Sequence, residues 1–155
     1  MTISSDHISV PLASMIGHGT IRAQVAALSW EDAVDHVGAL LVKAGKIHPG
    51  YISAMKHVLQ EMGPYAVIAP GIVLLHARPE DGVLEPCLGL VTLSTPVPFG
   101  HSQNDPVDLV FALGAVDKKA HIVALKQLAE MLENPDVLDK MRAAHNDLEL
   151  LEVFD

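Results

Sequence analysis

The chain has 155 residues, of which 50% are hydrophobic and 19% are charged, so it fits one folded domain (residues 1–155), and intrinsic disorder is excluded as its main state. Ten basic against 19 acidic residues give a net charge of −9, and only 4% of the residues are aromatic, so neither a basic face nor a stacking platform for nucleic acid is expected. No apolar run reaches the roughly 18 residues that span a bilayer, no signal-peptide pattern opens the sequence, and the lone Cys87 cannot form an internal disulfide, so we expect a cytoplasmic protein.

The first part of the chain predicts little regular structure. Residues 1–20 predict an extended lead-in with a short helix at residues 11–16. Residues 21–28 alternate in part between apolar and polar side chains, which is typical of a half-buried strand.

Two helices are predicted next. Ser29 fits an N-cap because acidic residues follow it in the first turn, and Gly45 fits the end of the same helix. Pro49 is suited to the first position of a second helix, which stops at Gly63. Both segments repeat apolar residues at helical spacing, so each should bury one face.

The middle of the chain changes its period. Four short apolar runs, rich in Val and Leu and bounded by Pro or Gly, occupy residues 65–69, 71–76, 87–93 and 107–113. Runs of this length and composition favour strands that are buried on both faces.

The C-terminal part is predicted to be helical. Asp117 can cap a helix over residues 118–133, Pro135 starts another, and residues 147–154 carry a last apolar pattern. The resulting order is one strand, two helices, four strands and two or three helices. It predicts a single α/β or α+β domain in which helices cover a central sheet.

Common catalytic motifs are absent from the sequence. There is no phosphate-binding GxxxxGK[ST] loop, no GxGxxG after a strand, no GxSxG elbow and no HExxH, and a cysteine-based zinc site needs more than one cysteine. The remaining candidates are the histidines. Five of the nine fit surface or structural positions and two stay undecided: His7, His18, His36, His57 and His145 in the first group, His48 and His101 in the second.

His76 stands out by its position. It ends an apolar strand run and precedes the polar turn at residues 77–82. The sheet should hold such a residue rigidly while the following loop opens it to solvent, which suits a reactive side chain.

His121 is the second candidate. It is the fourth residue after the predicted cap, Asp117, so it lies in the first turn of a helix. The free N–H groups of that turn attract anions and disfavour a protonated imidazole, which keeps the ring neutral. Lys118 and Lys119 add positive charge nearby.

Residues 63–82, GPYAVIAPGIVLLHARPEDG, resemble the active-site segment of the mannitol/fructose-type enzyme IIA superfamily, the phosphocarrier domains of the bacterial phosphoenolpyruvate-dependent sugar phosphotransferase system. The form GPYxVxAPG followed by HxRPE is similar to the ascorbate-type branch. Further segments agree with that branch: Ile21-Arg22 with residues 29–34, residues 90–93, and residues 104–108 running on to 115–117 and His121. The resemblance covers roughly residues 20–150.

The resemblance implies that His76 accepts the phosphoryl group and that His121 is the second active-site histidine. It also implies a mixed central sheet flanked by helices, the phosphocarrier protein HPr as donor, an enzyme IIB as acceptor and, indirectly, a membrane enzyme IIC permease as partner. No cofactor or metal is required. Each partner would need an apolar surface around His76, for which four residues are candidates: Leu75, Val83, Pro98 and Phe99.

The sequence departs from the superfamily pattern at two places. Leu75 occupies the position before the active histidine, where the superfamily usually has Pro, although Leu in a strand can adopt the same extended shape. Residues 58–62 lack the arginine of the mannitol-type branch, and Arg78 is the nearest replacement for stabilising the phosphoryl group.

Three alternatives stay open. The same fold could serve as a phosphorylation-dependent regulatory module. His76 and His121 could instead form a facial metal triad with a carboxylate such as Asp105 or Asp108. Finally, the departures at Leu75 and at the missing arginine are compatible with a degenerate, purely structural homologue.

Overall fold

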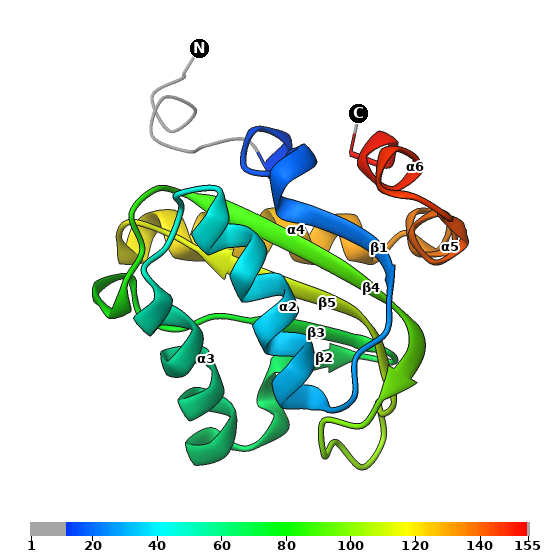
Figure 1. Cartoon of the computed structure of the whole chain (residues 1–155), viewed down its shortest axis with the longest axis horizontal. Coiled ribbons are helices and arrows are strands. Elements are labelled where there is room, and N and C mark those ends of the chain that lie inside the picture. The colour runs from blue at the N-terminus through cyan, green and yellow to red at the C-terminus, as the bar shows by residue number, and fades with distance from the viewer. Residues whose placement is uncertain (1–11, 155) are drawn as a thin grey trace.

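The computed structural model describes residues 12–154 and places five strands in one mixed sheet, in the order β1-β4-β5-β3-β2 (Figure 1). β1 runs parallel to β4 and β3 runs parallel to β5, whereas the β4–β5 and β2–β3 pairs are antiparallel. The strands are β1 (Ile21–Val25), β2 (Val67–Ala69), β3 (Ile72–Leu75), β4 (Cys87–Val97) and β5 (Val107–Gly114). The predicted single-domain α/β fold with a mixed sheet is confirmed.

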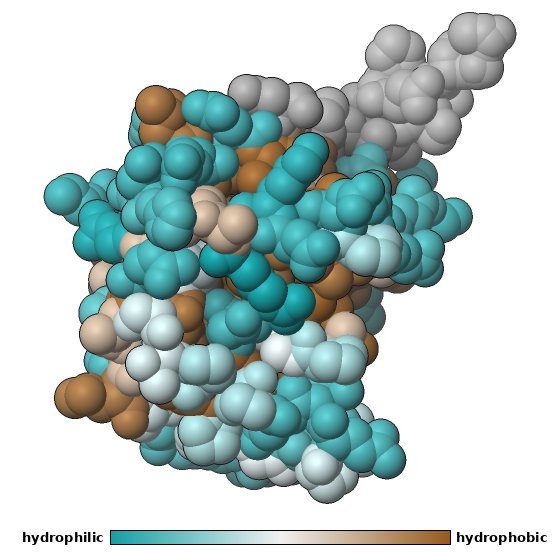
Figure 2. Space-filling view, turned by 90° about the vertical axis from the view of Figure 1, so that its right-hand side faces the viewer, coloured by the Kyte–Doolittle hydropathy of each residue, from teal (hydrophilic) through white to brown (hydrophobic). Residues whose placement is uncertain are grey.

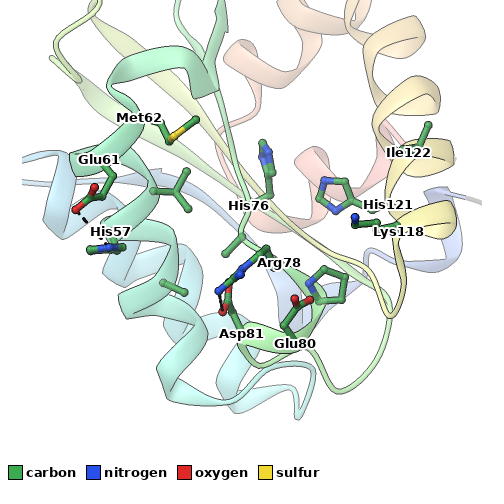
Figure 3. Close-up of a pocket in the computed structure, with 14 residues that line it drawn as sticks. His57, Glu61, Met62, His76, Arg78, Glu80, Asp81, Lys118, His121 and Ile122 are labelled. Carbon is green, nitrogen blue, oxygen red and sulfur yellow. Dashed lines mark hydrogen bonds and ion pairs between the residues drawn. The ribbon is translucent and has the colours of Figure 1, made fainter.

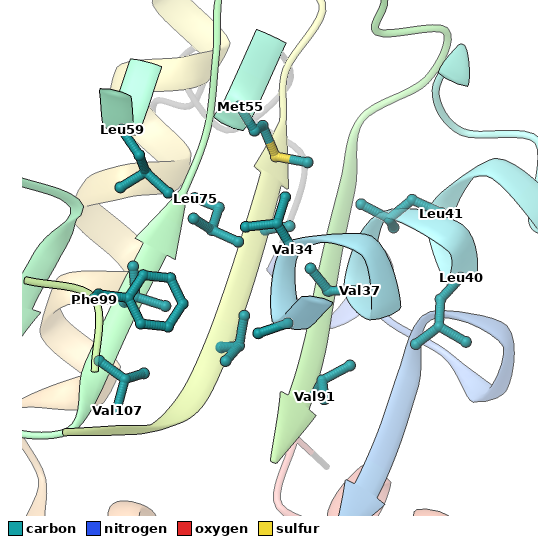
Figure 4. Close-up of a cluster of buried hydrophobic side chains, with 14 of the residues drawn as sticks. Val34, Val37, Leu40, Leu41, Met55, Leu59, Leu75, Val91, Phe99 and Val107 are labelled. Carbon is teal, nitrogen blue, oxygen red and sulfur yellow. The ribbon is translucent and has the colours of Figure 1, made fainter. Parts of the chain in front are cut away.

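Helices cover both faces of this sheet. In Figure 1, α2 (Trp30–Lys43) and α3 (Pro49–Met62) lie in front of the sheet, and α4 (Lys118–Leu132) lies behind it. The shorter α5 (Pro135–Ala143) and α6 (Asp147–Glu152) complete the α4 layer. Each layer buries its own apolar cluster against the sheet, and Figure 4 shows the one beneath α2 and α3.

The predicted helix ends are confirmed at the level of single hydrogen bonds. The Ser29 side chain accepts from the backbone N–H of Asp32, and the Asp117 carboxylate accepts from that of Ala120. Gly45 follows α2 with φ of 76°, a left-handed conformation that glycine adopts without steric cost. These short-range interactions explain why the starts of α2 and α4 could be located from the sequence.

Two strands end at other residues than predicted. β1 stops at Val25 instead of continuing to residue 28, because the backbone turns at Gln24, where φ is 59° and the register with β4 shifts. β4 continues beyond residue 93 to Val97, where it pairs with Val107 of β5. This extension is a two-stranded arm with exposed polar residues, so no apolar run marks it in the sequence.

The N-terminal prediction is tested only in part. A 3₁₀ turn, η1 (Leu12–Ser14), lies within the predicted short helix. Residues 1–11, which carry most of the predicted lead-in, and His7 lie outside the described residues.

The surface carries few extended apolar areas on the side of α5 and α6. Figure 2 shows this side, with hydrophilic residues predominating and hydrophobic ones scattered between them. None of the helices within residues 12–154 has the length and apolar character that crossing a bilayer requires.

Candidate active site

His76 lies where β3 leaves the sheet, and the alternation of β3 decides which way its side chain faces. Ile72 and Leu74 belong to the apolar cluster beneath α4, whereas Val73 and Leu75 belong to the cluster beneath α2 and α3. Because successive side chains of a strand point to opposite faces, His76 continues the row of Ile72 and Leu74. Its ring therefore faces the α4 layer.

The structure brings His76 and His121 together. Their ring centroids are 5.1 Å apart with planes tilted by 57°, although 44 residues separate them in the chain (121 − 76 = 45 positions). Figure 3 shows the two rings side by side, His76 above the end of β3 and His121 on the first turn of α4. The Asp117 cap fixes where that turn begins and hence which residue faces the sheet.

A backbone hydrogen bond fixes the proton of His76. Its Nδ1 lies 3.0 Å from the carbonyl oxygen of Leu74. Since a carbonyl can only accept, Nδ1 must carry the hydrogen, and Nε2 of the neutral ring keeps its lone pair. His76 is half-buried, so the ring is both held and accessible.

His121 is tuned to be neutral. Burial lowers its pKa below the ordinary histidine value of 6.5, and the neighbouring His76 lowers it further. Its Nδ1 is buried without a hydrogen-bond partner. A buried N–H without an acceptor is costly, so we assign the lone pair to Nδ1 and the hydrogen to Nε2.

Both histidines line an open pocket of about 700 Å³ between α3 and α4 (Figure 3). Apolar side chains form much of its wall, and charged groups stand at its mouth. The lining residues are Ala54, His57, Val58, Glu61, Met62, His76, Ala77, Arg78, Pro79, Glu80, Asp81, Lys118, His121 and Ile122. Such a pocket can admit a small charged group attached to a partner.

Arg78 lines the pocket but is not a free cation. Its guanidinium donates to both carboxylate oxygens of Asp81 at 3.3 Å. This hydrogen bonding raises the pKa of Arg78 and lowers that of Asp81, so the pair stays ionised. Arg78 remains at the site, with its charge partly neutralised.

Lys118 is a pocket residue to which the sequence gave no role of its own. It is the first residue of α4 and lies beside His121 in Figure 3. Within residues 12–154 no carboxylate forms an ion pair with it. Its place in the turn that carries His121 was the available signal.

The other histidines of the described chain have structural or surface surroundings. Nδ1 of His101 accepts from the backbone N–H groups of Gln103 and Asn104, which orders its loop. His48 precedes α3 without a side-chain cap. His36 and His57 each lie within 3.5 Å of a carboxylate on the next turn of their own helix. His57 also lines the pocket.

The carboxylates of the metal alternative lie elsewhere. Asp105 accepts from the backbone N–H groups of Phe99, Gly100 and His101, and Asp108 forms a two-point ion pair with Arg142. Asp108 lies at the start of β5, beside the start of β3, whereas His76 follows its end. In the described part of the chain no three His, Cys, Asp or Glu residues are grouped to hold a metal ion.

The expected apolar docking surface was wrong in two of its four residues. Leu75 is only 1% exposed and Phe99 8%, and both pack in the cluster shown in Figure 4. Strand alternation turns Leu75 toward α2 and α3, away from solvent. The exposed apolar residues at the pocket are instead Met62 at 61% and Ile122 at 65%.

The comparisons with known proteins agree with this geometry. Over 143 residues the chain is 38% identical to the ascorbate-specific PTS system EIIA component of Escherichia coli (strain K12), covering 92% of this chain and 93% of that protein. The structure superposes on the mannitol-specific cryptic phosphotransferase enzyme IIA CmtB of Escherichia coli with a TM-score of 0.81, at 29% identity and covering 93% and 98% of the two chains.

A further solved structure is a complex of enzyme IIA for mannitol with phosphorylated enzyme IIB, both from Escherichia coli. The match has a TM-score of 0.78 at 25% identity and covers 90% and 96% of the chains. Residues 14–155 match the family described as phosphoenolpyruvate-dependent sugar phosphotransferase system, EIIA 2. The chain therefore belongs to this family of EIIA components, which are phosphotransferases of sugar uptake.

Proposed function

We propose that the chain accepts a phosphoryl group from HPr on His76 and passes it to an enzyme IIB. The observation that supports this most directly is the pairing of His76 and His121, 5.1 Å apart in an open pocket. One ring can form a bond to phosphorus while the other contacts the transferred group. The 38% identity to an ascorbate-specific component supports an ascorbate-type system.

The step at His76 uses the lone pair of Nε2. Nε2 attacks the phosphorus carried on the histidine of HPr, a P–N bond forms as the donor's P–N bond breaks, and the donor ring keeps the released electron pair. The attacking ring becomes positively charged. The Leu74 carbonyl, which accepts from Nδ1–H, stabilises that charge.

The surrounding groups stabilise the transferred phosphoryl group, whose charge is spread over three oxygens in the transition state. The Nε2–H of neutral His121 is a hydrogen-bond donor at the site. Lys118 and Arg78 add positive charge at the pocket, Lys118 without an ion-pair partner in residues 12–154 and Arg78 together with Asp81. These groups replace the arginine that residues 58–62 lack.

Partners reach the site over an apolar rim. Met62 on α3 and Ile122 on α4 lie on either side of His76 in Figure 3 and expose most of their side chains. A partner that covers them excludes water from the reacting groups, which strengthens the electrostatic interactions. We assign this rim to contacts with both HPr and enzyme IIB.

The experiment is phosphoryl labelling. The chain is mixed with radiolabelled phosphoenolpyruvate, enzyme I and HPr, and one acid-labile phosphoryl group per chain is expected. His76→Ala should lose the label, whereas the matched control His57→Ala, a pocket-wall histidine outside the proposed chemistry, should keep it. Equal labelling of His76→Ala and the unsubstituted chain would refute the assignment.

A second stage separates a carrier from a regulatory module. The labelled chain is purified and mixed with an ascorbate-type enzyme IIB. Loss of label from the chain with its appearance on enzyme IIB supports the carrier function, and label that stays on the chain supports the regulatory alternative.

A further inference from the structure

A buried hydroxyl connects the two segments that carry the histidines. Tyr51, in the first turn of α3, is fully buried. Its O–H donates to the Leu113 carbonyl at 2.8 Å, and its oxygen accepts from the Ala77 N–H at 2.9 Å. Ala77 directly follows His76, and Leu113 lies four residues before the cap of the helix that carries His121.

The Tyr51 hydroxyl occupies the place of a sheet hydrogen bond. The N–H of Leu109 donates to the Gly71 carbonyl, and the parallel β3–β5 register runs from Ile72–Leu109 to Leu75–Ala112. In a parallel ladder, this phase makes the next hydrogen bond after residue 75 the one from Ala77 N–H to Leu113 C=O. The Tyr51 oxygen lies between these two groups and bonds to both.

The insertion separates β3 from β5 where both strands end. With a direct hydrogen bond, Ala77 and Leu113 would be held at ladder spacing, whereas the inserted oxygen adds the length of a second hydrogen bond. His76 leaves the sheet at this point, and β5 continues from it toward His121. The spacing of the two strand ends therefore fixes the spacing of the two rings.

The hydroxyl is suited to a permanent role of this kind. Burial raises the pKa of Tyr51 to about 12, so the group keeps its proton as a donor at any physiological pH. The loop after His76 also packs tightly on Tyr51, since a Cβ added at Gly82 would lie 3.3 Å from the Tyr51 Cβ. Neither side of the hydroxyl has room to rearrange.

We propose that Tyr51 is a positioning residue: its hydroxyl replaces the last β3–β5 hydrogen bond and so sets the distance between His76 and His121. The inference builds on the proposed function, because the distance matters only if both rings act on one phosphoryl group. Tyr51 itself touches neither the phosphoryl group nor a partner.

The test is Tyr51→Phe, which keeps the ring and removes the hydroxyl. We expect the maximal rate of phosphoryl transfer from HPr to fall at least tenfold, with the apparent KM for HPr within twofold of its original value. The NMR titration midpoint of His121 should move toward the ordinary histidine value, because its contact with His76 is altered. A change of stability alone would not move that midpoint.

Two controls accompany the variant. Tyr65→Phe removes the hydroxyl of the other tyrosine, which is exposed, and Val37→Ala weakens the core on α2 away from the site. Both should keep the transfer rate and the His121 midpoint. The inference is overturned if Tyr51→Phe also keeps both.

A measurement on the unsubstituted chain covers the case in which Tyr51→Phe does not fold. The Ala77 amide should exchange with solvent at least 100-fold more slowly than a free loop amide, and exchange at the free rate would overturn the inference. Failure of the unsubstituted chain to accept label would refute the proposed function, while the His121 midpoint and the Ala77 exchange would still decide the role of Tyr51.

Discussion

Phosphorylation of His76 should reverse the tuning of His121. In the free chain, burial is the main cause that lowers the pKa of His121, and His76 is the second. A phosphoryl group on His76 adds about two negative charges beside the same ring. The attraction favours the protonated form of His121, so its pKa should rise.

The size of the effect follows from the spacing of the rings. With two negative charges at the 5.1 Å centroid distance, Coulomb's law gives about 6.5 kcal/mol at an effective dielectric constant of 20 and about 1.6 kcal/mol at that of water. Since 1.36 kcal/mol corresponds to one pKa unit, even the lower value gives a shift that NMR resolves.

The assay is an NMR pH titration of the His121 ring before and after phosphorylation, with His36 on α2 as an internal reference. The His121 midpoint should move upward on phosphorylation, and the His36 midpoint should stay. A His121 midpoint that stays unchanged while one phosphoryl group is bound would refute the placement of that group between the two rings.

Three other substitutions have defined outcomes. His121→Ala should still accept label on His76 but transfer it onward about 100-fold more slowly in quench-flow measurements, because a donor to the phosphoryl oxygens is lost; an unchanged rate would contradict this role. Lys118→Gln should slow labelling about tenfold, whereas Lys119→Gln, which changes the adjacent charge outside the pocket lining, should not; equal effects would indicate a general charge effect. Arg142→Ala should lower the free energy of unfolding in urea by about 2 kcal/mol, because the partly buried carboxylate of Asp108 loses its two-point partner, and a loss below 0.5 kcal/mol by the same assay (roughly the range of ordinary surface substitutions) would show the pair to be unimportant.

Local features of the fold could be predicted because they depend on neighbouring residues. The caps at Ser29 and Asp117 bond to an N–H three residues away, and the buried strands are continuous apolar runs. The end of β4 could not be located in this way. Its last residues are exposed and polar, and only their pairing with the start of β5 makes them a strand.

The site depends on contacts between distant segments. Periodicity marked His76 as the end of a strand and His121 as part of a first helical turn, but only the β3–β5 pairing and the place of α4 bring the rings together. The family resemblance supplied that pairing in the sequence, and the comparisons support it. The same limit explains the error at Leu75, because its burial depends on which helices cover each face of β3.

Tyr51 could not be identified from the sequence at all. Its ring fits the apolar pattern of α3, and a buried tyrosine in a helix has many uses. The role of its hydroxyl becomes visible only when the ladder between β3 and β5 is followed to the point at which it is interrupted.

The central claim is that Nε2 of His76 carries the phosphoryl group. Phosphorus and nitrogen NMR of the chain, labelled with ¹⁵N in its histidine rings and phosphorylated through HPr, identifies both the residue and the ring nitrogen. The hydrogen bond from Nδ1 to Leu74 predicts a single signal in which phosphorus is bound to Nε2 of His76. Phosphorus bound to Nδ1, to His121 or to any other residue would contradict the account.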